Sequence, residues 1–564
     1  MANRDRLSDL PDYLLRRVLH FAPAKEAAST TALSRRWRTP LWRSSGAVNL
    51  ETRVEDYEYR DRYGGYLEED KALFFSRRDA FLSAAVAALD GAQHVTRLTL
   101  RLESERERDK PVDEFLHDYE DDRRWSDRDH SVIAVLLSHR AARCIEELRL
   151  VANDWSSDTY HDGEICCWNR VGVYTLTLDS LPSNNLRVLD LTNCSGLYLP
   201  THAAAKVIDV APTLTVVRLE SVLIKVTDDA TSQCDAARDW GYDGVPAPKQ
   251  AARCRLRCPA ATVLALEGCK WEEDENLRRR RHHGYYDDDK TTPLIAVEID
   301  SPRLRRFRYM GLLRPFTFSP QPPELEQVDL HFFPGKKRNM DPCGNLETFW
   351  RFVGSFTSTK KMNLRLNHLE DVAVLNEAMR VELLPAFRRL ECLELEGVRR
   401  GRGKTAAAAI ANLLRCSNAL HDLRINLTTE HEDAYKQERY ITEFLEWKFR
   451  HDRDKSMDRF DRCDDSFSSE GDEETISVAY DDVPEIPGLS RRSFECLQSS
   501  LRRVALQFWL EKSNSLGIKL IKFFAENAMI LEEMHIDAGN GKLCEHVNHT
   551  IETWINHSSK SRNL

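Results

Sequence analysis

A glycine-rich segment, GRGKT at 401–405, contains the residue types that bind phosphate in nucleotide-hydrolysing proteins. In such loops backbone N–H groups surround the phosphates and the lysine neutralises them. The spacing does not fit, because the phosphate-binding loop needs a glycine five residues before Gly403, and this chain has Val398 there. The segment also follows a strand pattern, so we predict a turn that leads into a helix, without nucleotide hydrolysis.

Cysteine and histidine side chains occur in two groups with some likeness to zinc-ligand spacing. Cys544, His546 and His549 lie close together, and Cys254 and Cys258 are four residues apart. A structural zinc site normally needs two such spaced pairs, and each group lacks the second pair. No nucleophile, base and carboxylate with a catalytic arrangement are recognisable either. We therefore predict no metal, no cofactor and no catalysis by this chain itself.

Composition and charge limit the classes of partner. The 564 residues are 41% hydrophobic and 30% charged, with a net charge of -10 that is spread over both signs. This mixture excludes a whole-chain basic surface for nucleic acid. The start, MANRDRLSDLP, lacks the apolar core of a signal peptide, and no stretch reaches the ~18 apolar residues of a membrane helix. We expect a cytoplasmic and/or nuclear protein with reduced cysteines, binding neither nucleic acid nor membrane.

Two short helical patterns open the chain. Residues 7–21, LSDLPDYLLRRVLHF, place Pro11 where a first helical turn tolerates it and apolar residues on one face. Residues 24–42 are rich in alanine and then bring Leu33 and Trp37 into a second amphipathic stretch. About 40 residues bury too small a core to be stable alone, so the apolar side chains here predict a partner that covers them.

The sequence LPDYLLRRVLHF, followed by ALSRRWRTPLW, resembles the F-box, in which Leu-Pro opens the first helix and Ser-basic-basic-Trp closes the motif. In that family the box binds a small adaptor that links it to the cullin scaffold of a ubiquitin ligase. Ala22 departs from the usual leucine before Pro23. The resemblance implies adaptor-facing or box-core roles, without separating the two, for Leu10, Pro11, Leu14, Leu15, Val18, Leu33 and Trp37. A helical cap on the first repeat is the alternative.

A nine-residue pattern, apolar at positions one, four and six, recurs along most of the chain and is the strand half of a leucine-rich repeat. Copies begin at Val95, Ile145, Leu186, Leu214, Ala261, Leu304, Leu325, Thr359, Leu390 and Leu420. Spacings of 28 to 31 residues between well-formed neighbours leave room for a helix after each strand, and residues 406–417, after Thr405, have such a helical stripe. We therefore predict an α/β solenoid: a small all-α F-box, then a strand–helix horseshoe with a parallel sheet.

Alternation along each predicted strand turns positions four and six into the core and positions three, five and seven outward, onto the concave face. We predict that these outward residues bind the target. The charged members of the fifth-position row are Arg149, Asp190, Arg218, Arg308, Asp329, Arg365, Glu394 and Arg424. The mixture of charges is compatible with a protein target, although for any single residue a solvated sheet face is the simpler interpretation.

The last part of the chain contains two further copies of the pattern, at Leu501 and Leu531, with a helical stretch between them. Residues 496–537, especially LRRVALQF and FFAENAMILEEMHI, resemble the FBD domain at the C-terminus of many plant F-box proteins. F-box first, repeats in the middle and FBD last is the order of the plant F-box/leucine-rich-repeat/FBD family. The resemblance therefore covers almost the whole chain.

Charged insertions interrupt the repeats. The largest lies between the copies at Leu420 and Leu501 and contains DRFDRCDDSFSSEGDEET, which predicts an acidic disordered loop. Its serines would suit phosphorylation, and a solubilising insert fits equally. Four arginines at 278–281 would fit a nuclear signal, but the acids that follow offset them. The predicted divisions are 1–48 F-box, 49–94 linker and first solenoid helix region, 95–449 repeats with charged insertions, 450–488 acidic insertion, 489–540 FBD-like repeats and 541–564 tail.

The resemblance implies a non-catalytic subunit of a ubiquitin ligase. Its F-box would bind a Skp-type adaptor and, through it, the cullin scaffold, and its repeats would hold an unidentified protein target. Such a subunit accelerates lysine modification by raising local concentration and fixing orientation. A co-receptor for a small-molecule hormone and a repeat scaffold outside any ligase remain the alternatives.

Overall fold

The computed structural model divides into two compact units, residues 1–311 with 316–323 (unit 1), and residues 312–315 with 324–564 (unit 2). It describes residues 10–33, 37, 41–55, 68–104, 111–117, 131–153, 173–178, 181, 183–202, 207–209, 213–227, 253–271, 296–333, 342–399, 404–429, 494–508 and 515–537. The predicted acidic insertion, 450–488, lies outside the described residues.

Unit 1 opens with a small helical module made of α1 (Asp12–Leu19), α2 (Ala24–Ser29), η1 (Thr30–Ala32) and η2 (Leu41–Ser44). Pro11 and Pro23 precede the first two helices, where a missing N–H costs nothing. The module has its own apolar core of five buried side chains, Leu15, Leu19, Ala27, Trp37 and Leu41. Helices form in both predicted N-terminal segments, although the α-helix of the second ends at Ser29 and a 3-10 turn follows it.

Parallel front strands follow, each the first half of one repeat. In unit 1 they are, in spatial order, β1 (Ala47–Val54), β2 (Arg97–Ser104), β3 (Glu147–Asn153), β5 (Val188–Thr192), β8 (Val216–Glu220), β11 (Val263–Glu267) and β14 (Arg306–Gly311). Side chains alternate as predicted: Leu148 and Leu150 of β3 are buried, and Arg149 between them faces out. The first strand, β1, begins at the end of the predicted F-box and runs into the region predicted as linker and first solenoid helix. Its pattern was missed because position one is Ser45, a polar residue.

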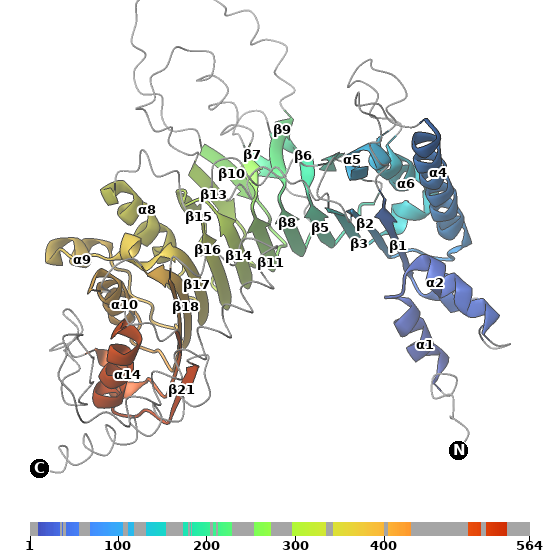
Figure 1. The fold of residues 1–564 in the computed structure, drawn as a ribbon. Coiled ribbons are helices and arrows are strands. Elements are labelled where there is room, and N and C mark those ends of the chain that lie inside the picture. The colour runs from blue at the N-terminus through green and yellow to red at the C-terminus, as the bar shows by residue number, and fades with distance from the viewer. Residues whose placement is uncertain are drawn as a thin grey trace, which may run out of the picture. The chain divides into compact units, whose positions relative to one another are not determined.

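Helices cover the inner face of the first strands. They are α4 (Glu68–Gly91), α5 (Pro111–Leu116) and α6 (Val132–Ser138), with the short η4 (Arg140–Cys144). Phe74 of α4 packs edge-on against Phe115 of α5, with ring centroids 6.0 Å apart. Figure 1 shows α4 and α6 on one side of β1 and the N-terminal module, α1 and α2, on the other side.

Strands, and not helices, form the second layer of the middle repeats in unit 1. The second sheet has the order β12-β9-β6-β7-β10-β13-β15, with β4 on β6, and only the β6–β7 pair is antiparallel among the described pairs. Its strands are β4 (Tyr174–Thr177), β6 (Cys194–His202), β7 (Val207–Asp209), β9 (Leu223–Thr227), β10 (Arg253–Arg257), β12 (Lys270–Trp271), β13 (Ala296–Asp300) and β15 (Phe316–Phe318). The strand–helix prediction is wrong for these repeats.

Sharp corners explain this second layer of strands. Asn193, Ser221 and Gly268 follow three successive front strands and have φ angles of 56°, 53° and 61°. A left-handed residue reverses the chain at once, so the next strand begins within two residues of the corner. Each corner N–H donates to the neighbouring coil, for example from Ser221 to the Glu267 carbonyl at 2.7 Å. No length is left between the strands for a helix.

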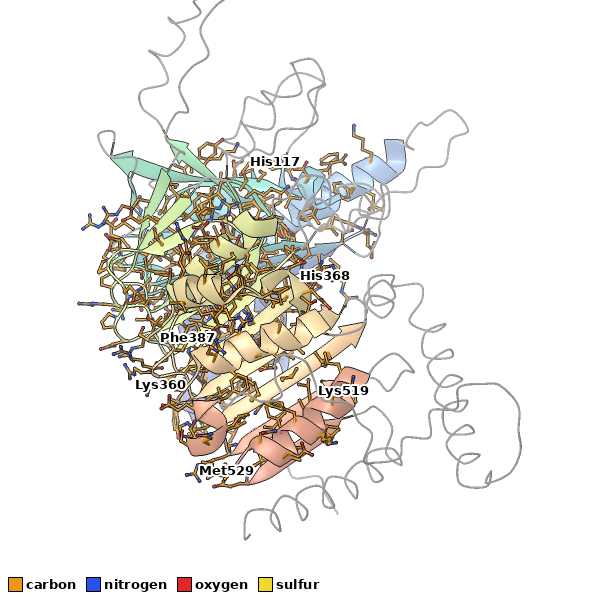
Figure 2. The ribbon with its side chains drawn as sticks, turned by 90° about the vertical axis from the view of Figure 1, so that its left-hand side faces the viewer. His117, Lys360, His368, Phe387, Lys519 and Met529 are labelled. Carbon is orange, nitrogen blue, oxygen red and sulfur yellow. The ribbon has the colours of Figure 1, made fainter. Side chains whose placement is uncertain are left out.

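Unit 2 follows the predicted strand–helix pattern. Its parallel front strands are β16 (Gln327–Phe332), β17 (Lys361–His368), β18 (Cys392–Arg399), β19 (Asp422–Thr429), β20 (Arg503–Phe508) and β21 (Glu533–Asp537). Behind them lie α8 (Pro342–Gly354), η8 (Leu369–Val372), α9 (Glu377–Leu383), α10 (Lys404–Cys416), α13 (Glu495–Ser499) and α14 (Ser515–Asn527). The helix predicted at 406–417 is confirmed as α10, which begins two residues earlier and ends one residue earlier. Figure 2 marks Lys519 on α14 and Met529 just after that helix ends.

Candidate partner-binding surfaces

Helix α1 and the turn that follows it carry two apolar stripes, of which one is buried and the other is exposed. Leu15 and Leu19, four residues apart, are 0% and 3% exposed and belong to the core of the module. Leu14, Val18 and Phe21 follow at helical spacing on a second stripe and are 36%, 50% and 55% exposed. Large apolar side chains that stay exposed together mark a surface that a partner covers.

The structure separates the predicted F-box residues that form the core of the module from those that stay exposed. Leu15 and Trp37 are core residues, and Leu10 packs partly buried against that core. Pro11 caps α1, since its carbonyl accepts hydrogen bonds from the N–H groups of residues 14 and 15 at 3.0 and 3.1 Å. The exposed members of the predicted set are Leu14, Val18 and Leu33.

Two exposed aromatic residues were not among the predicted site residues. Tyr13 is 67% exposed, and Phe21 lies on the same stripe as Leu14 and Val18. The spacing of 14, 18 and 21 was a usable signal, because it defines a stripe apart from that of 15 and 19. We define the apolar docking face as the exposed stripe of Leu14, Val18 and Phe21.

The second candidate surface is the fifth-position row of the front strands. In unit 1 the register aligns Asn49, Thr99, Arg149, Asp190, Arg218, Ala265 and Arg308 on neighbouring strands. Four of the predicted residues, Arg149, Asp190, Arg218 and Arg308, are therefore brought into one row. This row faces away from the buried leucines.

Charges in this row are largely matched within the front strands of unit 1. Arg218 Nη1 lies 3.7 Å from an Asp190 carboxylate oxygen, and Arg308 Nη1 lies 3.2 Å from Glu267. Arg149 lies 3.5 Å from Glu147, which also approaches Arg97. Exposed pairs of this kind are worth about 0–1 kcal/mol each, so a partner can exchange them for its own charges at small cost.

In unit 2 the row contains Asp329, Asn363, Glu394, Arg424, Ala505 and His535. The predicted Arg365 is not a member: it pairs in register with His331 and Glu396, two positions further along, and contacts the Glu396 carboxylate at 3.2 Å. The prediction was wrong because, in the copy that begins at Thr359, the fifth position is Asn363 and Arg365 is the seventh, which also points outward.

Arg365 changes the chemistry of its neighbour His331. Burial and the positive charge of Arg365 lower the pKa of His331 to about 4. The imidazole is therefore neutral at physiological pH, and its ring packs edge-on against Phe333 with centroids 4.9 Å apart. This end of the outward face offers hydrogen bonding and an aromatic surface, without a cation at the histidine.

The described cysteines behave as small hydrophobes. Cys254 and Cys258 are buried free thiols, and burial raises the pKa of the Cys194 thiol to about 12. Within the described ranges, no three His, Cys, Asp or Glu side chains are grouped so that they could hold a metal ion. Cys544, His546 and His549 lie outside those ranges. Nor do the described helices include one with the length and apolar character to cross a membrane.

Together, these features define a class: a parallel-strand repeat protein that carries a small helical module with an exposed apolar face before its first repeat. The chain is similar to several Arabidopsis thaliana proteins named for an F-box, an FBD and leucine-rich repeats. It is 43% identical over 60 residues to an F-box/FBD/LRR-repeat protein, covering 11% of this chain and 13% of the relative. It is 55% identical over 47 residues to a putative FBD-associated F-box protein, covering 8% and 25%.

A putative F-box/FBD/LRR-repeat protein of the same organism is 36% identical over 87 residues, 15% of this chain and 18% of the relative. The chain thus spans between 13% and 25% of the length of these three relatives. No family model matches the chain, and no solved structure matches it. The resemblance read from the motifs is confirmed over these short stretches.

Proposed function

We propose that this protein is the target-recognition subunit of a cullin-type ubiquitin ligase. The observation that carries the proposal is the apolar docking face, which stays exposed although the module has a separate core. A Skp-type adaptor that links to the cullin scaffold is the partner that this face fits. The names of the Arabidopsis relatives support the F-box assignment.

The repeats hold the target in this proposal. Their outward face presents Arg149, Asp190 and Arg218 in unit 1 and Glu394 and Arg424 in unit 2. A polar row of both signs suits a protein surface, where charge complementarity sets specificity and association rate. The chain contributes binding and orientation, works in the cytoplasm and/or nucleus, and needs no cofactor of its own.

Capture of the adaptor tests the proposal. The purified chain is mixed with a Skp-type adaptor, as wild type and as a Leu14→Asp, Val18→Asp double variant. Both side chains are half exposed and away from the core, so the variant should keep its circular dichroism spectrum while its affinity falls about 100-fold or more. Val381→Asp is the matched control, because Val381 is 83% exposed in unit 2 and its loss should leave capture unchanged.

The capture experiment has three distinguishable outcomes. Capture by the wild type and the control, lost in the folded double variant, supports the ligase subunit. Capture that survives in the double variant would show that the docking face is placed wrongly. No capture by the wild type would leave a repeat scaffold outside any ligase.

A further inference from the structure

The strongest link between the helical module and the repeats is a buried asparagine. Asn49 occupies the fifth position of β1, on the same outward row as Thr99 and Arg149. An outward residue is normally solvated, as Glu51 on the same strand is. Asn49 is only 4% exposed, and its side chain contacts the chain just after α1. The module therefore packs on the outward face of the first front strand.

Asn49 completes the end of helix α1. The last carbonyls of a helix have no partner within the helix and must find donors elsewhere. The Asn49 amide Nδ2 donates to the carbonyl of His20 at 3.0 Å and to that of Ala22 at 2.9 Å. The His20 ring in turn has Nδ1 2.9 Å from the Ser45 carbonyl, just before β1. Three hydrogen bonds thus join this helix end to the first repeat.

Flanking contacts restrict the same joint. The Arg97 guanidinium of β2 lies over the Phe21 ring, 5.0 Å from its centroid. The Trp42 ring lies so close to Gly91 that a Cβ at 91 would come within 2.8 Å of it. The N–H of Gln93 donates to the Arg43 carbonyl at 2.9 Å. Contacts on both sides of Asn49 prevent the module from swinging on its connection.

We propose that Asn49 is a positioning residue that seats the helical module on the outward face of β1 and fixes its orientation. Asn49 is covered by this seating and the Thr99 hydroxyl on the next strand is buried, so the open part of the fifth-position row begins at Arg149. The apolar docking face and the target-binding row of unit 1 are thereby held in one geometry. Only the ubiquitin-transfer readout below rests on the proposed function.

The test removes the two donors and measures the joint directly. In Asn49→Ala, hydrogen–deuterium exchange of residues 20–22 and 41–50 should become about tenfold faster, since two buried hydrogen bonds are lost. Exchange in unit 2 should stay at the wild-type rate, which shows that the chain remains folded. Asn363→Ala is the matched control: it lies in the same row in unit 2 and should leave the joint unchanged.

Asn49→Asp separates positioning from side-chain size. The shape is nearly kept, but a carboxylate faces the two carbonyls and cannot donate, so the joint should open more than in the alanine variant. Lowering the pH protonates the introduced carboxyl group and restores one hydrogen-bond donor. The difference in exchange rate between this variant and the wild type, measured at the same pH, should then become smaller. An unchanged joint in both variants would overturn the assignment of Asn49.

The consequence for function is measured in a reconstituted ligase with this chain as its own substrate. Asn49→Ala should capture the adaptor as well as the wild type, while mass spectrometry finds ubiquitin on additional lysines of the chain. An unaltered lysine pattern despite faster exchange would refute a positioning role in transfer. If the wild type does not capture the adaptor, the proposed function fails. The exchange experiment still tests whether Asn49 fixes the helical module on β1.

Discussion

The middle repeats of unit 1 and the repeats of unit 2 share their front strands and differ behind them. In unit 1 the chain turns at a single left-handed residue and runs straight into a second strand, as from Ser221 to β9. In unit 2 it passes into helices such as α8 and α10. The parallel ladder of the front strands therefore fixes each repeat, while the second layer has only to cover the inner face with apolar side chains.

The two second layers are also stabilised differently. Helix α8 places Phe349, Trp350 and Phe352 against the strands, with Phe356 in the turn that follows, and edge-on ring contacts include Phe349–Phe332 at 5.7 Å. The second sheet of unit 1 buries rings on strands, such as Phe318 against Phe307 with centroids 5.3 Å apart, and adds ion pairs such as Arg255 Nη2 to Asp300 at 3.0 Å. Loss of a buried helix ring should therefore matter most in unit 2, whereas the corner conformation is particular to the second sheet of unit 1.

The largest effect is expected from Trp350→Ala. Trp350 is 0% exposed and its Nε1 donates to the Val372 carbonyl at 3.1 Å. Loss of the ring leaves a cavity and an unpaired carbonyl, so the free energy of unfolding of unit 2 should fall by about 3–5 kcal/mol. Urea unfolding measures it. Arg351→Ala, on the exposed side of the same helix, is the control, and a loss for Trp350→Ala below about 1 kcal/mol would contradict a helix-based core.

Substitutions at two corner residues should change the free energy of unfolding by smaller amounts and in opposite directions. Gly268→Ala forces a Cβ into a φ of 61°, although its nearest neighbour would be 3.5 Å away, so backbone strain alone should cost about 1–2 kcal/mol. Ser221→Gly removes the same strain and should stabilise unit 1 by about 0.5 kcal/mol, after the entropy cost of glycine. Thermal unfolding compares them. A stability change in the same direction for both variants would show that the corner conformation does not determine the second sheet of unit 1.

The smallest effect concerns pH and the outward face of unit 2. The pKa of His331 is about 4 in the folded chain, below the usual value of 6.5, so the unfolded chain binds a proton more readily. Stability linked to this group is therefore present above about pH 6.5 and is lost as the pH falls towards 4. Urea unfolding of the wild type and His331→Gln between these values should show a weaker pH dependence in the variant. Parallel pH profiles would exclude His331 as a contributor.

Several features of this protein could be read from local residue patterns. The apolar spacing of residues 7–21 and the alanines of residues 24–42 predicted the N-terminal helices. The nine-residue pattern predicted the front strands, because period-two alternation directly encodes which side chains are buried. The helix at 406–417 was predicted by its alanines and its apolar stripe. Arg365 was assigned to the fifth-position row although it lies two residues beyond it, as the pairing of Asn363 with Asp329 and Glu394 shows.

The sequence by itself determined the repeat period, the inward residues of most front strands and the likeness to F-box proteins, since all of these depend on neighbours along the chain. Only the tertiary structure decided which apolar residues of α1 form the core and which form the docking face. It also decided that strands back the middle repeats and that Asn49 is buried under the module. These depend on contacts with distant segments: Asn49 meets His20 29 residues away, and Ser221 bonds to the next coil at Glu267.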